Sequence, residues 1–430
     1  MRAYACTLLF CAIVQAHALD LKEQAAQALE RKDAPAAAQL LSQAVAQEPH
    51  NFSLLMQLAT AHFLSHQYEK AATYFGQAVA HNPRHIQALF NCATAHSKCG
   101  HFQTALSFYE KVFEQYQAEN VKNVLYKMYI RCRKWHKAQA IRPPQLWWYT
   151  SSIYNKTIAL DCCKPGNGLG DVIQFIRYAK RVSQAGAHVI VKAPEALHPL
   201  LQRASYINRL YGPEEELPHS DHLFDICIAS LLAVSYEQFE MNAPQESYLT
   251  ADPYLVSEWK KRLAQDSNYK IGLCWKSNVV RDRFTGAIMP SPRSVPLEAL
   301  ATLADHRCSF YSLHKQSQTV EGPLAITQFC NDFDESHGRF MDTAALIANM
   351  DLIITVDTSI AHLAGALGKP VYLLLSCESD YRWFTDTNST PLYPNMRLFR
   401  QTTFGEWDTV ITRIARDLSA LTPTAHTQSC

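Results

Sequence analysis

A 34-residue period in the first third of the chain constrains the fold most strongly. From about residue 19 to residue 141, small residues and large apolar residues recur at equivalent positions every 34 residues. The clearest repeat unit begins at Phe52. Small residues let two helices cross closely, large apolar residues fill the space between them, and a proline ends the second helix. In the unit that begins at Phe52 these positions are Leu55, Leu58, Ala59, Ala71, Phe75, Ala78 and Pro83. A chain with this period folds into stacked helix pairs, because one pair cannot bury its apolar face alone.

The neighbouring units repeat the signature, which is that of tetratricopeptide repeats. One period earlier it comprises Leu21, Ala25, Ala37, Leu41, Ala44 and Pro49, and one period later Leu89, Ala93, Gly100, Phe102, Ala105 and Tyr109. A weaker fourth unit contains Trp135 and Ala138. We therefore expect three clear repeats and one partial repeat over residues 19–145. Such an array usually binds a protein or peptide partner in a concave groove; a structural or dimerising spacer is the alternative.

The first 18 residues have the pattern of a secretory signal. Arg2 precedes an apolar stretch from Ala3 to Val14, and Ala16-His17-Ala18 fits a small-x-small cleavage site. We expect cleavage after Ala18 and export to a periplasmic, extracellular or lumenal compartment. The alternative is an N-terminal helix packed on the repeats of a cytoplasmic protein. Cysteine usage favours that alternative, because thirteen cysteines less the two in the signal leave an odd number without a C-x-x-C pair.

Length and composition exclude several classes of protein. The 430 residues suffice for about three domains, and 48% hydrophobic with 18% charged residues can bury large cores. A formal net charge of +1 predicts no general attraction to nucleic acid or to an anionic membrane. No internal apolar run reaches the length of about 20 residues that a membrane span needs. We expect no nucleic-acid partner and no transmembrane segment in the mature chain.

Strand-like runs alternate with helical ones from residue 157 onward. Arg142-Pro143-Pro144 closes the array, and we expect Trp147-Trp148-Tyr149 to pack domains together. The alternation occurs twice and predicts two Rossmann-like parallel-sheet halves facing a cleft, over 151–251 and 252–425. The expected strands are 157–162, 187–192, 225–228, 270–275, 309–313, 352–356 and 371–375, and the expected helices 171–185, 195–204, 342–349 and 359–367.

A glycine-rich loop, Gly166-Asn167-Gly168-Leu169-Gly170-Asp171, joins the first strand to its helix. It is not the dinucleotide motif G-x-G-x-x-G, because the third glycine comes one place early and the next strand ends in Lys192 instead of an acid. It also lacks the G-K-[ST] ending of a P-loop. Glycines allow a ligand to approach the backbone, and Asp171 adds a carboxylate beside it. Asp171 as a simple helix cap is the alternative.

A second motif follows the strand 352–356. Asp357 ends the strand, and Thr358-Ser359 opens a helix of small residues that stops at Gly368-Lys369-Pro370. The carboxyl ends of parallel strands are where open α/β sheets bind ligands, and N–H groups at a helix start can receive a diphosphate. Asp357 and Thr358 acting only as caps is the alternative.

Three segments together resemble the ADP-heptose:lipopolysaccharide heptosyltransferase-like glycosyltransferases. They are Gly168–Asp171, Arg293–Leu297, and Asp357-Thr358-Ser359 with His362–Val371. The chain is more closely similar to tetratricopeptide proteins that carry such a domain. Over residues ~157–415 the resemblance implies a GT-B fold, a nucleotide-sugar donor, and neither metal nor other cofactor.

The resemblance also implies roles for individual residues. Asp171 is the implied general base, and Gly168, Leu169 and Gly170 form the acceptor-side loop. The implied donor-side residues are Arg293, Asp357 and Thr358, and we also expect Lys276, Ser359 and His362 on the donor side. Two departures matter: Ser359 stands where the family often has glycine, and the segment 281–292 is longer than usual. Lys276, Arg281 or Arg283 are therefore alternatives to Arg293.

The expected reaction is metal-independent transfer of a sugar, with inversion, from a nucleotide sugar to a hydroxyl of a glycan, lipid or protein. The repeats would recruit a partner or the acceptor. A non-catalytic scaffold with a degenerate transferase-like domain is the main alternative, and a nucleotide-sugar epimerase is a third. We expect His219-Ser220-Asp221-His222 to be a polar loop and not a metal site.

Overall fold

The protein forms two compact units in the structure, a computed structural model. A helical unit comprises the chain up to Ile141 together with Val280–Met289, and an α/β unit comprises Arg142–Val279 with the chain from Pro290 onward. The described residues are 20–141, 153–163, 167–220, 222–225, 247–282, 285–305, 307–315, 321–329, 332–385 and 387–421. The expected signal segment and the Trp147-Trp148 pair lie outside these residues.

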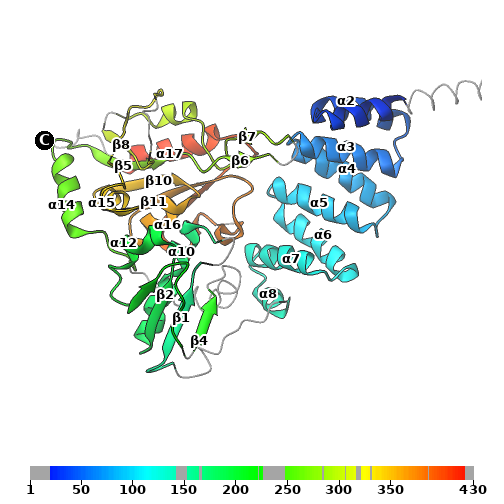
Figure 1. The fold of residues 1–430 in the computed structure, drawn as a ribbon. Coiled ribbons are helices and arrows are strands. Elements are labelled where there is room, and N and C mark those ends of the chain that lie inside the picture. Colours follow the sequence, from blue (N-terminus) through cyan, green and yellow to red (C-terminus); the bar gives the residue numbers. More distant parts are fainter. Residues whose placement is uncertain are drawn as a thin grey trace, which may run out of the picture. The chain divides into compact units, whose positions relative to one another are not determined.

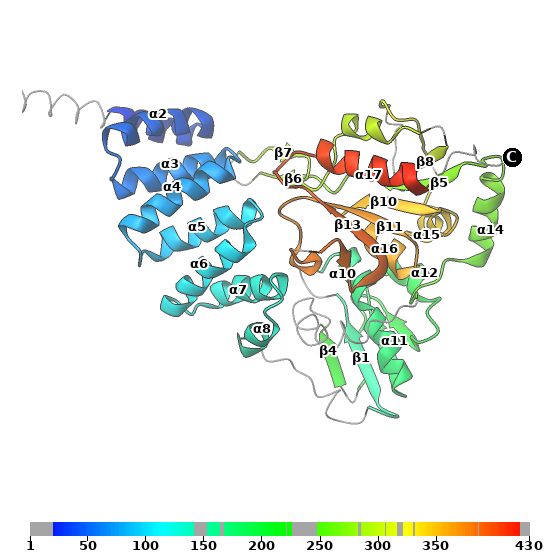
Figure 2. The ribbon, with the colours of Figure 1, turned by 180° about the vertical axis from the view of Figure 1, so that it is seen from behind.

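The helical unit confirms the prediction of stacked helix pairs (Figures 1 and 2). After a helix over 20–30, its helices are α2 Ala34–Gln47, α3 Phe52–Leu64, α4 Tyr68–His81, α5 Ile86–Lys98, α6 Phe102–Gln115, α7 Glu119–Arg131 and α8 Trp135–Ile141. The repeat-defining residues Leu58, Ala59, Phe75 and Ala78 are all at most 2% exposed. These positions form the core because each helix pair buries its apolar face against the next pair.

A short hairpin groups with the helical unit although it lies far from it in sequence. It consists of β6 Val280–Arg281 and β7 Ile288–Met289, which pair antiparallel. Lys32 donates a hydrogen bond to the Thr285 carbonyl at 3.2 Å, and His66 lies 3.7 Å from an Asp282 oxygen. The segment that the sequence marks as longer than usual thus reaches the repeats.

The first half of the α/β unit is a four-stranded parallel sheet in the order β3-β2-β1-β4. Its strands are β1 Thr157–Asp161, β2 His188–Lys192, β3 Arg209–Tyr211 and β4 His222–Asp225. The chain leaves β1 toward β2 on one side and returns as β4 on the other. This change of direction places a topological switch point beside the carboxyl end of β1, where the glycine loop begins.

Three expectations for this half need correction. The expected helix 171–185 is two helices, α10 Leu169–Phe175 and α11 Arg177–Gln184, separated by Ile176. The expected helix 195–204 is reduced to the 3-10 turn η1 Glu195–Leu197 and the one-turn helix α12 His198–Leu201. The expected strand 225–228 begins earlier, as β4, so His222 starts a strand and does not belong to a loop.

The second half has a seven-stranded sheet in the order β12-β13-β11-β10-β5-β8-β9. All its pairings are parallel except that of the edge strand β12. The strands are β5 Tyr269–Cys274, β8 Cys308–Ser312, β9 Ile326–Thr327, β10 Leu352–Val356, β11 Val371–Leu375, β12 Ser389–Thr390 and β13 Tyr393–Arg400. Every residue of β10 and β11 is buried, which explains why both read as continuous apolar runs.

The helices and 3-10 turns of this half are α14 Pro253–Arg262, η2 Glu298–Leu303, α15 Met341–Ala348, α16 Ser359–Ala366, η3 Tyr381–Trp383 and α17 Asp408–Leu421. The two α/β halves confirm the predicted fold class. Sequence patterns did not predict β13 or α17.

Two features bear on the expected class of protein. No helix within the described ranges is both long and apolar enough to cross a membrane. The cysteines that the structure describes form no disulfide, and seven of these eight thiols are buried. The predicted compartment stays a prediction.

Candidate functional site

Asp357 and Thr358 lie at the topological switch point of the larger sheet. Neighbouring strands β5 and β10 pair Cys274 with Thr355, so Lys276 and Asp357 each follow two residues later, at the same sheet edge. The chain proceeds from β5 to β8 on one side and from β10 to β11 on the other. Ligands of open α/β sheets bind where such connections diverge.

The start of α16 is capped by Thr358. Its hydroxyl accepts a hydrogen bond from the Ile360 N–H at 3.3 Å, and its backbone is extended. Asp357 is 5% exposed, and burial together with the nearby Asp380 charge raises the pKa of its carboxyl. Arg382 and Arg293 oppose that rise. The first turn of α16 presents Ser359, which is only half-buried.

Arg293 contacts the buried Asp357, and its own side chain is partly exposed to solvent. One guanidinium nitrogen donates to the Asp357 carbonyl at 3.2 Å and lies 3.6 Å from a carboxylate oxygen. The Arg293 side chain is 44% exposed, whereas that of Asp357 is 7% exposed. A guanidinium in this position can bind an anion at the start of α16 while it still neutralises the charge of the buried Asp357 carboxylate.

His314 orders the chain that leads to Lys276, and sequence patterns did not reveal it. Its Nε2 accepts hydrogen bonds from the N–H groups of Trp275 at 3.1 Å and Lys276 at 3.2 Å. Nε2 therefore carries no proton. Burial, with a smaller effect of Lys276, lowers the pKa of His314 to about 4, so the ring stays neutral. The Lys276 side chain is exposed at the end of β5.

Asp171 lies in the first turn of α10, and both of its carboxylate oxygens are engaged. Oδ2 accepts the Gly168 N–H at 2.7 Å, which satisfies a donor at the helix start. Oδ1 accepts a guanidinium N–H of Arg382 at 2.7 Å. The Asp171 side chain is 16% exposed. Each carboxylate oxygen has two lone pairs, so these bonds leave acceptor capacity for a substrate hydroxyl.

Arg382 connects the two halves of the α/β unit, and its role could not be found from sequence. It belongs to η3 of the second half, yet it reaches Asp171 and also the Gln174 amide oxygen at 2.6 Å. Its Nε donates to Asp380 at 2.9 Å. The side chain is 9% exposed, and the surrounding carboxylates raise its pKa against the opposing effect of burial. Asp171 and Arg382 are 211 residues apart, so no local pattern links them.

Gly170 allows α10 and α16 to approach each other. A Cβ added at this position would lie 3.0 Å from His362 Cδ2 and 3.2 Å from Ser359 Cα. Gly170 therefore packs closely against another protein segment, with little room for a side chain, whereas the sequence had suggested approach of a ligand. Leu169 is half-buried, and Gly168 is exposed. The loop thus brings Gly170 to the start of α16.

His362 is buried beneath this contact. Its Nδ1 lies 2.9 Å from the Tyr393 hydroxyl, and its ring stacks on Trp383 at a centroid distance of 5.4 Å. Burial, reinforced by the charges of Arg382 and Arg177, lowers its pKa well below the usual value. His362 can orient α16, but it is only 3% exposed.

The structure brings Gly170 against Ser359 and His362, and Arg382 links Asp171, to which it donates, with Asp357, which its charge stabilises. Of the alternatives to Arg293, Arg281 lies in the hairpin of the helical unit, and Arg283 lies outside the described residues. Asp380, Arg382 and His314 join the candidate site. The functional roles of all these residues remain predictions.

Family comparisons identify both parts of the chain. The model described as "Tetratricopeptide repeat" matches residues 28–73 and 62–127. The model described as "Glycosyltransferase family 9 (heptosyltransferase)" matches residues 338–383. This second match contains Asp357, Thr358, Asp380 and Arg382 and ends before β13. It does not include Asp171.

A curated relative, Protein FlbA of Caulobacter vibrioides, is 23% identical over 274 residues. The match covers 59% of this chain and 46% of the relative, so the chain spans less than half of that protein.

Two solved structures are also similar to parts of the chain. A glycosyl transferase family 9 protein from Veillonella parvula has 12% identity and a TM-score of 0.44, covering 64% of this chain and 93% of its own. The Sgt2 tetratricopeptide domain from Aspergillus fumigatus has 27% identity and a TM-score of 0.25, covering 30% of this chain and 85% of its own.

Proposed function

Because the chain carries tetratricopeptide repeats and a domain of glycosyltransferase family 9, we propose that it transfers a sugar from a nucleotide sugar to an acceptor hydroxyl. The observation that carries this proposal is the convergence of Asp357-Thr358, at the switch point of one sheet, with Asp171, from the switch point of the other. The proposed reaction inverts the anomeric centre and needs no metal. The repeats recruit a protein partner or the acceptor.

In the proposed mechanism, the donor diphosphate binds the N–H groups at the start of α16 and the guanidinium of Arg293. Helix-start N–H groups and cations stabilise the charge that develops on a departing phosphate. Lys276, at the same sheet edge, is a second exposed cation for this anion. Asp171 accepts the proton of the attacking hydroxyl, and Arg382 keeps its carboxylate oriented. These groups take the place that a divalent cation has in other transferases.

The donor site can be tested by thermal-shift measurements with nucleoside diphosphates and their sugars. A ligand at about 100 times its Kd should stabilise the α/β unit by about 2.7 kcal/mol. Asp357→Asn should weaken that stabilisation. The matched control is Asp351→Asn, because Asp351 lies at the opposite end of β10, where it accepts the Lys270 N–H. If no nucleotide stabilises the wild type, the donor site is wrong.

The catalytic step needs its own measurement. Asp171→Asn should reduce transfer or donor hydrolysis by about 10²–10⁴-fold while leaving nucleotide stabilisation intact. Activity should persist in a chelator if the reaction is metal-independent. A specific observation favours the second candidate, a non-catalytic scaffold: both oxygens of Asp171 already accept hydrogen bonds within the protein. Nucleotide binding without turnover on glycan, lipid and protein acceptors would support that scaffold.

A further inference from the structure

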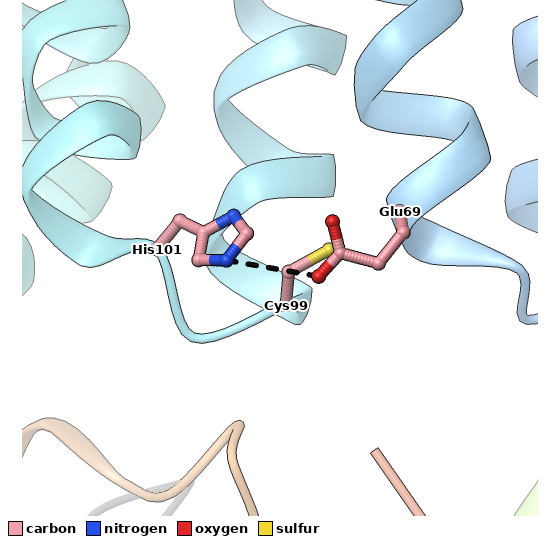
Figure 3. Close-up of side chains that lie close together, drawn as sticks. All are labelled: Glu69, Cys99 and His101. Atoms are coloured by element: carbon pink, nitrogen blue, oxygen red, sulfur yellow. Dashed lines mark ion pairs between the residues drawn. The ribbon is translucent and has the colours of Figure 1, made fainter. Parts of the chain in front are cut away.

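The turn between α5 and α6 places two side chains of metal-binding type beside a third from the preceding repeat. They are Cys99 at the end of α5, His101 before α6, and Glu69 in the first turn of α4 (Figure 3). One potential ligand atom from each lies within 4.8 Å of the other two. We propose that Glu69, Cys99 and His101 form a binding site for a zinc-type divalent transition metal.

The backbone of the turn holds the two ligands from the third repeat in fixed positions. Gly100 has a left-handed φ of 83°, and the His101 N–H donates to the His96 carbonyl at 2.9 Å. This is the bond that closes a Schellman turn at a helix end. Cys99 and His101 therefore flank one rigid glycine and point toward the same side, where Glu69 lies (Figure 3).

The imidazole of His101 is oriented for ligation. Among the described helix starts, the ring of His85 caps α5 by accepting the Ala88 N–H at 3.2 Å, whereas that of His101 makes no such bond to α6. Its Nδ1 instead lies 3.4 Å from His96 Nδ1. When His101 donates this hydrogen bond, Nε2 keeps its lone pair and faces Glu69. Ligating histidines in metalloproteins are held in this way by a partner on the other ring nitrogen.

The separation of His101 and Glu69 suits a small tetrahedral ion after modest side-chain rotation. Tetrahedral zinc with ordinary bond lengths requires about 3.4–3.6 Å between neighbouring ligand atoms. His101 Nε2 and Glu69 Oε1 are 3.7 Å apart, and their side chains are 49% and 68% exposed, so both can adjust. Their exposure also gives an ion a path to the buried Cys99 thiol.

The ligand set selects the class of metal. Thiolate and imidazole favour zinc and its neighbours in the first transition series, whereas calcium and magnesium prefer an all-oxygen set. Three protein ligands leave one tetrahedral position for water. Because Glu69 belongs to the second repeat and Cys99 to the third, a bound ion would clamp adjacent helix pairs.

Titration of the full chain with Co²⁺ tests the site, because a thiolate ligand gives a sulfur-to-cobalt charge-transfer band. One equivalent should produce this band in the wild type, and excess Zn²⁺ should remove it. Cys99→Ser should abolish the band. The matched control is Cys132→Ser, since Cys132 occupies the same place in the α7–α8 turn and is buried to a similar extent. The control should keep the band.

Two further variants separate ligation from adventitious thiol binding. Glu69→Gln should weaken Co²⁺ affinity while the band persists, since the thiolate remains. His96→Phe retains an aromatic ring against Phe108 but removes the partner of His101, and should weaken affinity about 10–100-fold. Absence of the band in folded wild-type protein, or its persistence in Cys99→Ser, would overturn the site. Far-ultraviolet circular dichroism establishes that each variant is folded.

Discussion

Replacing Arg382 by methionine should destabilise the α/β unit far more than loss of an ordinary surface ion pair. Arg382 donates to Asp171, Asp380 and Gln174 at 2.7, 2.9 and 2.6 Å. Its removal leaves two carboxylates and an amide oxygen without these donors in a largely buried position. Breaking a buried pair costs about 3–5 kcal/mol. Water can reach Asp171 and Asp380, whose side chains are 16% and 33% exposed. We therefore expect about 3 kcal/mol.

Arg397→Met supplies the matched control. Arg397 pairs with Asp417 at a similar distance of 2.8 Å, but its side chain is 55% exposed. A pair with one well-exposed partner contributes about 0–1 kcal/mol, because water solvates the Arg397 guanidinium whether or not the pair forms. The two variants share the same substitution, so the difference between their losses of stability measures the effect of burial on the ion pair.

Hydrogen exchange followed by mass spectrometry is the appropriate assay, because global unfolding of a chain with two units mixes their transitions. Peptides spanning α10 and α16 should exchange roughly 100-fold faster in Arg382→Met, corresponding to about 3 kcal/mol. Peptides from α3 to α6 should not change. Combining Arg382→Met with Asp171→Asn should cost less than the sum of the single losses, by about 0.5–3 kcal/mol. Equal effects of the Arg382 and Arg397 variants would refute the reasoning.

Two more substitutions test the packing and the pH dependence of the site. Gly170→Ala should destabilise the α/β unit by about 1–3 kcal/mol through its clash with α16, whereas Gly76→Ala, whose added methyl meets nothing within 4 Å, should stabilise α4 by about 0.5–1 kcal/mol. Thermal melts measure both changes in stability. If the two substitutions changed stability in the same direction, the packing argument would be contradicted. Folding lowers the pKa of His314 to about 4, so as the pH falls the ring is protonated in the unfolded chain before it is protonated in the folded chain. The free energy of unfolding should therefore decrease as the pH drops from about 6.5 toward 4. The loss of stability is on the order of 2 kcal/mol at pH 5. Urea unfolding at pH 5 and pH 7 measures this loss, and His314→Gln should reduce it. A loss of the same size in the variant would show that His314 does not cause the pH dependence.

The helical unit was predictable because its contacts are local and repeated. Leu55 and Ala59 are buried, as are Leu89 and Ala93 one period later, so the same packing pattern recurs from one helix pair to the next. The buried strands β10 and β11 were predictable for a related reason, since both faces of each strand are covered and all their residues are apolar or small.

Other elements carried too weak a signal. The strands β3, β9 and β12 have two or three residues each, which is too short for a period of two to be recognised. The break between α10 and α11 falls at Ile176, where neither glycine nor proline marks it. By contrast, Pro199 lies inside the expected helix 195–204, and the structure there retains only a 3-10 turn and one helical turn.

The two sides of the candidate site depend on different kinds of information. On the proposed donor side, Asp357 and Thr358 directly follow a buried strand and open a helix, so a sequence motif was sufficient to predict where they lie. On the proposed acceptor side, Arg382, which comes from the other half of the unit, donates to Asp171 and holds its carboxylate. Arg382 also lowers the electrostatic cost of burying Asp357. Arg382 therefore supports both carboxylates at once, and its substitution should disturb the proposed donor and acceptor sides together even though no single motif contains both.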